Sequence, residues 1–561
     1  MKKLYYGDNL HVLRDYVKDE SVDLIYLDPP FNSKRDYNLL FKTPKPPKKA
    51  DGKAALKAEE PQAEYADASI TAFEDTWHWG QQAADEFREI LKCGNTDVAE
   101  LMQALRAFLK ENDMMAYLVM MCNRLLELHR VLKPTGSLYL HCDPTASHYL
   151  KIVLDGVFGK EYYLNEIIWL RTNAHNMKAF GWARSNDTIF YYSKSAKYTF
   201  NTQYEPYGEE QLSRYKPDQK GRLYKAENLT FSSSNKSRQF TWRGTTPPLN
   251  RSWGASLEQL ERWWQEGRVL AKQDGSPRMD GLKVFLDEMP GKIVGTNWSD
   301  ISRVGNTSGE RLGYPTQKPL ALLERIISAS SNEGDVVLDP FCGCGTAVHA
   351  AEKLKRQWIG IDITHLAVSL IEKRMKEAFP YLANKDAFEI IGTPQDLGAA
   401  RDLAERDKHQ FQLWACTLVG AQPYKGGKKG ADGGIDGMLW IEVGGTGKSS
   451  QTEKVIVQVK GGIHVNRANI ATLKGDIDRE KAAIGLFITL AEPTQPMKIE
   501  AAAAGHYENP SHGSFPKIQI LTIEGLLNGT ERPNFVDMSY GKQTFKKAKI
   551  EKKNQKQGDL F

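Results

Sequence analysis

Apolar residues recur with two different spacings in the first quarter of the chain. Residues 3–6 and 22–27 are short apolar runs, and the second stops abruptly at turn-forming residues, as buried strands do. Residues 10–16 and 114–132 carry apolar side chains at the spacing of a helix face, and a further strand is predicted at 137–141. Strands that alternate with helices predict a parallel sheet covered by helices, which is an α/β fold.

The same pattern returns near the middle of the chain. It predicts helices at 319–330 and 346–354, each followed by a strand, at 336–338 and 358–361. The preceding stretch, 198–296, is instead polar, aromatic and turn-rich. Its tryptophans stand among basic residues: Trp242, Trp253, Trp263 and Trp264. We therefore expect one α/β domain that is interrupted by an insertion.

The composition shifts again after Pro380, and a third block from about residue 396 carries a predicted helix at 411–419 and strands at 438–442 and 455–460. Residues 42–66 are rich in Lys, Pro, Ala and Glu, and we expect a mobile loop because they cannot bury enough apolar surface. The predicted division of the chain is 1–197, 198–296, 297–385, 396–530 and a basic tail at 540–561.

Bulk composition excludes some classes of protein. The 561 residues are too many for a single core, and 41% hydrophobic with 26% charged residues is ordinary for a globular protein. No apolar run approaches the length of a membrane span, and the N-terminus lacks an apolar signal segment, so we expect a cytoplasmic protein. The net charge of +5 permits a nucleic-acid partner without requiring one.

The cysteines give little support for a metal module. There are six, and none forms a C-x-x-C pair, which fits a reducing compartment and argues against a zinc site. Cys342 and Cys344 flank a glycine, and we interpret them as small residues of a turn.

A glycine-rich turn follows the strand that ends at Asp339. Gly343 and Gly345 lack Cβ atoms and so allow a ligand to approach the backbone, and the helix that begins at Thr346 offers free N–H groups to a carboxylate. Asp362 ends the next strand, where a carboxylate can accept both ribose hydroxyls. The turn has no phosphate-loop signature, which disfavours a nucleotidase. The alternative is a plain strand-to-helix turn.

The tetrapeptide Asp28-Pro29-Pro30-Phe31 closes the strand at 22–27. Its prolines lack N–H donors and stiffen the turn, so acceptors are exposed at the carboxyl edge of the sheet, where open α/β sheets bind ligands. The Asp28 carboxylate and the Pro29 carbonyl are suited to hold the N–H bonds of an exocyclic amine, and Phe31 is suited to stack on a base. An isolated D-P-P-F is more often a turn with a solvated Asp, but this one shares a chain with the glycine turn.

Together these motifs resemble the β-class DNA amino-methyltransferases, a circularly permuted Rossmann-like family in which the catalytic motif precedes the cofactor motif. The resemblance covers about 1–380, apart from the loop and the insertion. It rests on motifs that occur in the family's order: Gly7-Asp8-Asn9, Asp28-Pro29-Pro30-Phe31, Gly136-Ser137-Leu138-Tyr139, Tyr314-Pro315-Thr316-Gln317-Lys318-Pro319 and Asp339-Pro340-Phe341-Cys342-Gly343-Cys344-Gly345-Thr346.

The resemblance implies S-adenosylmethionine as the cofactor and double-stranded DNA as the substrate. Asp8 is then expected to contact the cofactor's adenine, and Thr316, Lys318 and Pro319 to border its methionine part, although Lys318 also fits an ordinary surface lysine at a helix start. The remaining cofactor residues implied are Asp339, Phe341, Gly343, Gly345, Thr346 and Asp362. The insertion takes the place of the target recognition region. D-P-P-F is typical of adenine-N6 members, whereas cytosine-N4 members usually begin this motif with Ser.

The third block carries Gly430-Ala431-Asp432-Gly433-Gly434-Ile435-Asp436-Gly437 and, on a later strand, Gln458-Val459-Lys460. This arrangement resembles the Mrr-type restriction endonuclease domain, a PD-(D/E)xK fold. Asp436 is the expected Mg²⁺ ligand, Lys460 would orient water and stabilise phosphate charge, and Gln458 lies on the face of Lys460. Gln458 replaces the usual acid, and Gln412 stands where the family often has Glu. The alternative is a β-hairpin with a surface lysine.

Our leading hypothesis is an adenine-N6 DNA methyltransferase fused to a Mg²⁺-dependent endonuclease domain, with a role in restriction–modification or phage defence. One alternative is a cytosine-N4 enzyme whose third block binds DNA without cleaving it. Another is methylation of RNA or protein, and the oligomeric state, including a homodimer, is open. The hypothesis requires the segments around Asp28 and Gly343 to meet at one edge of one sheet.

Overall fold

The computed structural model describes most of the chain. The described residues are 2–30, 36–40, 69–74, 77–172, 182, 185–233, 235–305, 308–312, 314, 316–384, 387–424, 434–444, 451–509, 513–535 and 551. The catalytic candidate Phe31, the loop expected at 42–66 and the basic tail apart from Glu551 lie outside this set. Within it, no helix combines the length and apolar character that a membrane crossing requires.

The first sheet contains nine strands within the described residues. In spatial order they are β16 (Asn297–Trp298), β6 (Tyr163–Leu170), β7 (Asn186–Ser193), β5 (Leu132–Cys142), β2 (Val22–Leu27), β17 (Val336–Asp339), β18 (Gln357–Asp362), β1 (Lys2–Tyr6) and β19 (Glu389–Ile391). The five strands from β5 to β1 are mutually parallel, whereas β7 runs antiparallel to both β5 and β6. Strand β17 thus lies between β2 and β18, and this places the second α/β segment in the middle of the first, as a circularly permuted Rossmann-like fold requires.

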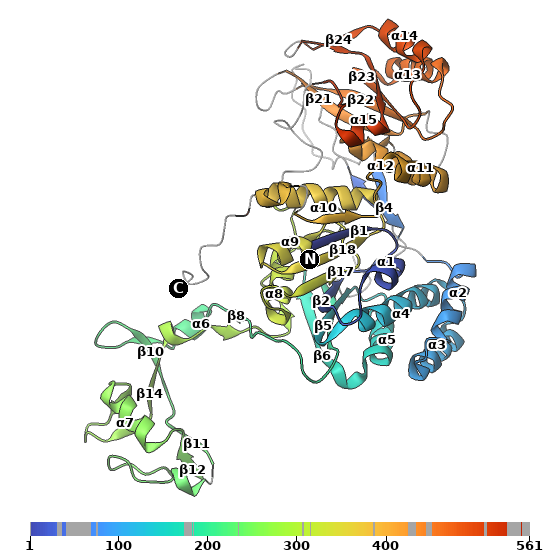
Figure 1. The fold of residues 1–561 in the computed structure, drawn as a ribbon. Helices are drawn as coiled ribbons and strands as arrows, with labels where there is room; N and C mark the ends of the chain where they lie inside the picture. The colour runs from blue at the N-terminus through green and yellow to red at the C-terminus, as the bar shows by residue number, and fades with distance from the viewer. Residues whose placement is uncertain are drawn as a thin grey trace, which may run out of the picture. The chain divides into compact units, whose positions relative to one another are not determined.

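Helices cover both faces of this sheet (Figure 1). Helices α1 (Asn9–Tyr16), α4 (Asp113–Val131) and α5 (Ser147–Phe158) lie on one side, and α8 (Leu320–Ser330), α9 (Thr346–Lys353) and α10 (His365–Ala378) on the other. Helices α2 (Gln81–Ile90) and α3 (Thr96–Leu109) pack against α4. Alternate residues of β2 therefore face opposite layers, and all its apolar side chains are buried. A strand buried on both faces reads as a continuous apolar run, which is why the sequence predicted it.

Most predicted elements of this domain occur within one or two residues of their expected bounds. The strand predicted at 137–141 differs more, because β5 begins five residues earlier, at Leu132. In the C-terminal block, the helix predicted at 411–419 is α12 (Lys408–Leu418). Its first turn, Lys408-His409-Gln410, is polar and so falls outside the apolar pattern. Asp407 caps that turn, because its side chain accepts from the backbone N–H groups of His409 and Gln410, both at 3.0 Å.

Residues 202–295 form a separate compact unit, drawn in green in Figure 1. Its elements are β8 (Tyr204–Glu205), α6 (Glu209–Leu212), β9 (Lys216–Pro217), β10 (Leu223–Glu227), β11 (Thr230–Ser232), β12 (Arg251–Trp253), α7 (Leu257–Gln265), β13 (Val269–Ala271), β14 (Pro277–Phe285) and β15 (Lys292–Ile293). Trp242 and Trp253 are buried in its core, and the Trp253 indole N–H donates to the Phe240 carbonyl at 2.8 Å. These two tryptophans are therefore core residues and not exposed stacking platforms.

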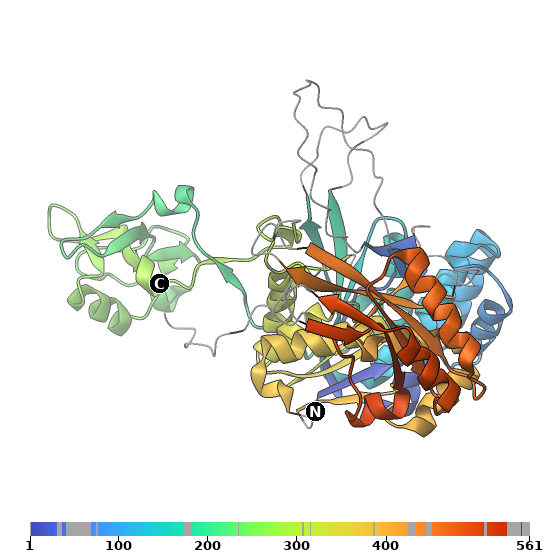
Figure 2. The same cartoon turned by 90° about the horizontal axis from the view of Figure 1, so that it is seen from above.

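A second main sheet lies in the C-terminal block, where Figure 2 shows its strands side by side in orange to red. The described order is β20 (Gln422–Pro423), β21 (Gly437–Gly444), β22 (Gln451–Lys460), β23 (Ile484–Thr489) and β26 (Ile518–Thr522). The hairpin β24 (His506–Asn509) and β25 (Gly513–Pro516) is separate. Helices α11 (Leu397–Arg406), α12 and α15 (Ile523–Asn528) share one core with this sheet, and α13 (Arg467–Glu480) and α14 (Gln495–Ala503) share the other.

Candidate active sites

Each of four neighbouring parallel strands in the first sheet ends at an aspartate. Asp28 follows β2, Asp339 ends β17, Asp362 ends β18 and Asp8 follows β1. Parallel strands present their carboxyl ends at the same edge, so these side chains gather there and line one cavity of about 1020 Å³. The Gly343 turn lines the same cavity. The segments around Asp28 and Gly343 thus meet at one edge of one sheet.

The Asp28 carboxylate lies between the ends of β2 and β17. From β2 the chain continues to β5 on one side of this pair, and from β17 it continues to β18 on the other side. The Asp28 Oδ2 atom pairs with the ammonium of Lys318, while Oδ1 is buried without a hydrogen-bond partner among the described residues. Pro29 and Pro30 line the cavity beside it. Lys318 is only 8% exposed, so it is not a surface lysine.

The neighbours of Lys318 differ in their position. Thr316 lines the cavity and has a left-handed backbone conformation, with φ of +61°. Pro319 immediately precedes α8 and is not among the residues that line the cavity, so its contact with the cofactor stays a prediction. Tyr314, which sequence reasoning had not singled out as a site residue, also lines the cavity and is buried.

The two glycines of the turn have different roles. Gly343 has φ of +52° and lines the cavity, and a Cβ atom there would lie 3.1 Å from the ring of Tyr314. Gly345 has φ of +73° and precedes α9, but it does not line the cavity. A Cβ at Gly345 would lie 2.7 Å from the side chain of Ile371 in α10. This glycine therefore makes room for a neighbouring helix, and its contact with a ligand stays a prediction.

The remaining residues of the turn lie close to the cavity. Phe341 and Thr346 line it, as expected. Cys342 and Cys344 line it too, and both are buried free thiols, which agrees with their interpretation as small turn residues.

Asp362 fixes the conformation of the glycine turn. Its Oδ2 atom accepts from the Gly343 N–H at 2.9 Å, and its Oδ1 atom accepts from the Thr364 N–H and hydroxyl, both at 2.9 Å. Burial raises the pKa of Asp362 to about 6 in spite of these donors. Each carboxylate oxygen has two lone pairs, so Asp362 retains acceptor capacity toward the cavity.

The pKa of the Asp339 carboxyl is shifted further than that of Asp362. Burial raises the pKa of Asp339 to about 8, and the nearby charge of Asp28 contributes in the same direction. The hydrogen bond that its Oδ1 accepts from the Phe341 N–H, at 3.0 Å, opposes this shift only in part. An acid held at such a pKa marks a site where a charge is desolvated, which is typical of functional positions.

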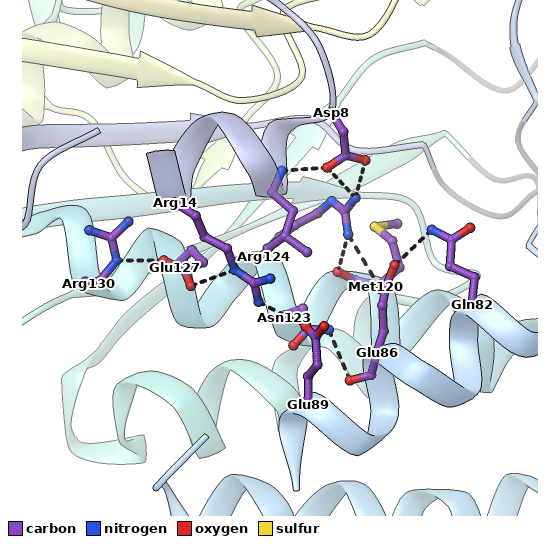
Figure 3. Close-up of polar contacts among 11 residues, drawn as sticks. Asp8, Arg14, Gln82, Glu86, Glu89, Met120, Asn123, Arg124, Glu127 and Arg130 are labelled. Atoms are coloured by element: carbon purple, nitrogen blue, oxygen red, sulfur yellow. Dashed lines mark hydrogen bonds and ion pairs between the residues drawn. The ribbon is translucent and has the colours of Figure 1, made fainter. Parts of the chain in front are cut away.

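Asp8 is held by a buried arginine that sequence reasoning missed (Figure 3). Arg124 of α4 is 6% exposed and donates from Nη2 to Asp8 Oδ2 at 2.9 Å and from Nε to Asn9 Oδ1 at 2.6 Å. The Asn9 amide in turn donates to the Pro340 carbonyl at 2.8 Å. Arg124 therefore connects the end of β1 with the turn after β17. The available signal was a lone basic residue within the apolar run of 114–128.

The second set of predicted residues meets on the C-terminal sheet. Strands β21 and β22 are antiparallel, with Gly437 opposite Val457, and the Asp436 N–H donates to the Val457 carbonyl at 2.9 Å. The Asp436 Oδ2 atom accepts from the Val459 N–H at 2.7 Å. Gln458 and Lys460 share one face of β22, and Gln458 is 2% exposed. The structure thus brings Asp436 beside the Gln458–Lys460 pair.

Two observations limit what this second site contains. Helix α12, which carries Gln412, packs with Val455, Val457 and Val459 on the opposite face of β22 from Gln458. Across the residues that the structure describes, no group of three or more His, Cys, Asp or Glu side chains is arranged to hold a metal ion.

The buried Asp339 gives a prediction about stability. An unfolded aspartate titrates near about 3.9, whereas the folded pKa is about 8, so the protein loses stability through this group as pH rises between these values. Asp339→Asn removes the charge and keeps an acceptor for the Phe341 N–H. We expect it to raise the Tm by about 3 °C or more at pH 8, and by less at pH 5.

Thermal unfolding at the two pH values checks this, with Asp402→Asn at an exposed position of α11 as the control. If the Tm does not rise, or rises equally at both pH values, the buried charge of Asp339 is not what destabilises the protein at high pH.

Comparisons with known proteins agree with this geometry. A family model described as a DNA methylase matches residues 22–373, and one described as a restriction endonuclease matches residues 403–521. The Type II methyltransferase M.EcaI of Enterobacter cloacae is 33% identical over 263 residues, which are 46% of this chain and 57% of that protein. The DNA adenine methyltransferase YhdJ of Escherichia coli is 44% identical over 94 residues, which are 17% of this chain and 32% of that protein.

Solved structures are more distant. A DNA modification methylase from Thermus thermophilus, complexed with S-adenosyl-L-methionine, is 16% identical, with coverage of 70% of this chain and 98% of that one and a TM-score of 0.32. The chain spans about half the length of the curated relatives it matches. The methylase model nevertheless covers well over half of the 561 residues. The chain therefore belongs to the DNA methylase family, and its C-terminal part contains a restriction endonuclease domain.

Proposed function

We propose that this chain transfers a methyl group from S-adenosylmethionine to adenine N6 in double-stranded DNA. The observation that carries the proposal is the position of Asp28, Pro29 and Pro30 beside the Gly343 turn, in one cavity between β2 and β17. Neither motif is specific by itself. Their convergence supplies both an amine-binding group and a cofactor turn within one cavity.

The cavity fits S-adenosylmethionine, which supplies an electrophilic methyl group when bound. Gly343 leaves its backbone accessible, and a side chain there would enter the cavity beside Tyr314. Asp362 and Asp8 are carboxylates at the ends of adjacent strands, suited to ribose hydroxyls and to an adenine amine respectively. Asp339, Phe341, Thr316 and Lys318 would border the methionine part.

Asp28 and Lys318 would act on the target amine. The Asp28 Oδ1 atom has no hydrogen-bond partner among the described residues, so it is ready to accept an N–H of the amine. Pro29 and Pro30 cannot donate, which leaves carbonyl acceptors on this turn. The Lys318 ammonium pairs with Oδ2 and balances the charge of Asp28 in the absence of substrate. Asp28 is then the nearest base for the proton that the amine nitrogen must release.

Adenine is favoured over cytosine by the Asp at the first position of the tetrapeptide, since Asp28 matches the adenine-N6 pattern of the family. The name of the relative YhdJ as an adenine methyltransferase agrees with this choice. We further propose that the compact unit at 202–295 recognises the DNA target, since it stands where the family has its recognition region.

We also propose that the C-terminal domain cleaves DNA in a Mg²⁺-dependent reaction within a restriction–modification or phage-defence system. Asp436 and Gln458 would supply oxygen ligands, and Lys460 would orient water and stabilise phosphate charge. The Gln458 Oε1 atom is buried without a partner among the described residues, which fits a ligand position. The alternative is a domain that binds DNA without cleaving it.

Removal of Asp28 tests the methyl transfer. With labelled cofactor and duplex DNA, Asp28→Ala should reduce transfer at least about a thousandfold, since it removes the acceptor of the amine, while the cofactor Kd stays within about twofold of wild type. Equal losses of transfer and of cofactor affinity would refute the role of Asp28. Labelling of tRNA or ribosomal protein instead of DNA would refute the substrate, and separation of the modified nucleosides distinguishes adenine from cytosine.

Arg124→Lys tests the cofactor end of the cavity. Lysine keeps the positive charge but cannot donate to Asp8 and Asn9 in the same fixed geometry. We expect the Kd for S-adenosylmethionine, measured by calorimetry, to rise about tenfold, or about 1.4 kcal/mol. Arg130→Lys on the same helix is the control, because Arg130 pairs with Glu127 and Asp19 outside the cavity. An equal effect of the two substitutions would argue against a specific role of Arg124.

Lys460→Ala tests the nuclease. Cleavage of unmethylated plasmid in Mg²⁺ should fall at least about a hundredfold, because the side chain that would stabilise the phosphate charge is removed, while methylation persists. Lys454→Ala on the same strand is the control, since Lys454 lies over the ring of Trp440 and away from Gln458. Plasmid that stays intact with wild type and variant alike would favour the DNA-binding alternative.

A further inference from the structure

A second buried acid lies beside the predicted nuclease residues. Asp476, in the middle of α13, is 3% exposed, and its Oδ2 atom has no hydrogen-bond partner among the described residues. Gln458 is 2% exposed, and its Oε1 atom also has no hydrogen-bond partner among the described residues. A buried oxygen without a donor costs about 1–3 kcal/mol, and more when it is charged. Two such oxygens, one on β22 and one on α13, lack the donor or cation that a buried oxygen normally has.

A glycine turn lies against both side chains, with the Gln458 amide nitrogen and Asp476 Oδ2 nearest to it, and a half-turn of the amide places Oε1 there instead. Gly434 has φ of +81°, and a Cβ atom there would lie 3.3 Å from Gln458 Nε2 and 3.5 Å from Asp476 Oδ2. Gly434 is two residues before Asp436, whose own position is fixed by hydrogen bonds to β22. The turn, strand β22 and helix α13 therefore converge, and the missing side chain of Gly434 leaves space between them.

We propose that Asp476 supplies the second carboxylate of a divalent-cation site, whose other protein oxygens come from Asp436 and Gln458. The inference rests on the proposed nuclease function and deepens it. Hard cations such as Mg²⁺ prefer carboxylate and amide oxygens, and one carboxylate with a neutral amide is a weak set. Asp476 offers the second negative charge that the strand itself lacks, from a helix that follows it in the chain.

The ion pair of Asp476 does not explain its burial. Its Oδ1 atom accepts from Arg479 Nη1 at 2.6 Å, one turn along the same helix, and the Arg479 side chain is half exposed. Such partly exposed pairs contribute little to stability. The pair uses only Oδ1, so it orients the carboxylate and leaves Oδ2 beside the Gly434 turn.

Mn²⁺ titration of the full chain, followed by calorimetry, tests the proposal without any cleavage measurement. Asp476→Asn should weaken Mn²⁺ binding at least about tenfold, because it removes a charged ligand. The matched control is Asp478→Asn on the same helix, whose exposed side chain pairs with Lys517 at 3.2 Å, and we expect no change there. Asp436→Ala should abolish binding at this site.

The outcomes separate the inference from the function on which it rests. Binding lost in Asp436→Ala but unchanged in Asp476→Asn would overturn the role of Asp476 alone. If the wild type binds no Mn²⁺, or if Asp436→Ala leaves all Mn²⁺ binding unchanged, the proposal of a metal-dependent nuclease is overturned as well. If Asp476→Asn does not fold, Gln458→Glu replaces it, since an added carboxylate beside Asp476 should tighten Mn²⁺ binding, and unchanged or weaker binding would count against the site.

Discussion

The parallel pairing of β2 with β17 is the constraint on which the rest of the structure depends. It sets Leu24 opposite Val337 and Ile25 opposite Leu338, and so joins two segments that lie far apart along the chain. Asp23 secures this pairing from the other end of the strands, because its Oδ2 atom accepts from the Val336 N–H at 2.9 Å and from the Lys133 ammonium of β5 at 2.8 Å. With the register fixed, Asp28 and Asp339 must emerge side by side at the carboxyl edge.

The gathering of carboxylates at that edge has an energetic cost. Four aspartates line one cavity, and the pKa of Asp339 is raised to about 8 and that of Asp362 to about 6 by burial. Lys318 and Arg124 lie against two of the four and offset part of the repulsion, at Asp28 and Asp8 respectively. A protein selected only for stability would not retain this arrangement, whereas a cationic cofactor and an amine substrate would both be stabilised by it.

In the C-terminal domain, too, the register of the strands brings polar side chains from distant segments together. The antiparallel register of β21 and β22 places Asp436 beside Gln458, and α13 brings Asp476 to the same place. Both Gln458 and Asp476 retain a buried oxygen without a partner among the described residues. In each domain the strands set the spacing of the reactive groups, and a helix from elsewhere in the chain adds the residue that adjusts their charge.

The sequence by itself determined the local elements and the family. Short apolar runs and helical spacing predicted β2, β17, β18 and α4 within a residue or two, and the motif order led to the permuted methylase fold that the family model confirms. These features depend on neighbours in the chain, which periodicity and turn chemistry report directly.

Only the tertiary structure decided which side chains meet. Arg124 and Asp476 belong to the sites, Gly345 makes room for Ile371, Pro319 lies outside the cavity, and Trp242 is buried in a core. In sequence each of these is an ordinary helix, turn or aromatic residue. Its role arises from contacts with segments distant in the chain, and those contacts depend on strand order and helix packing, which local patterns do not specify.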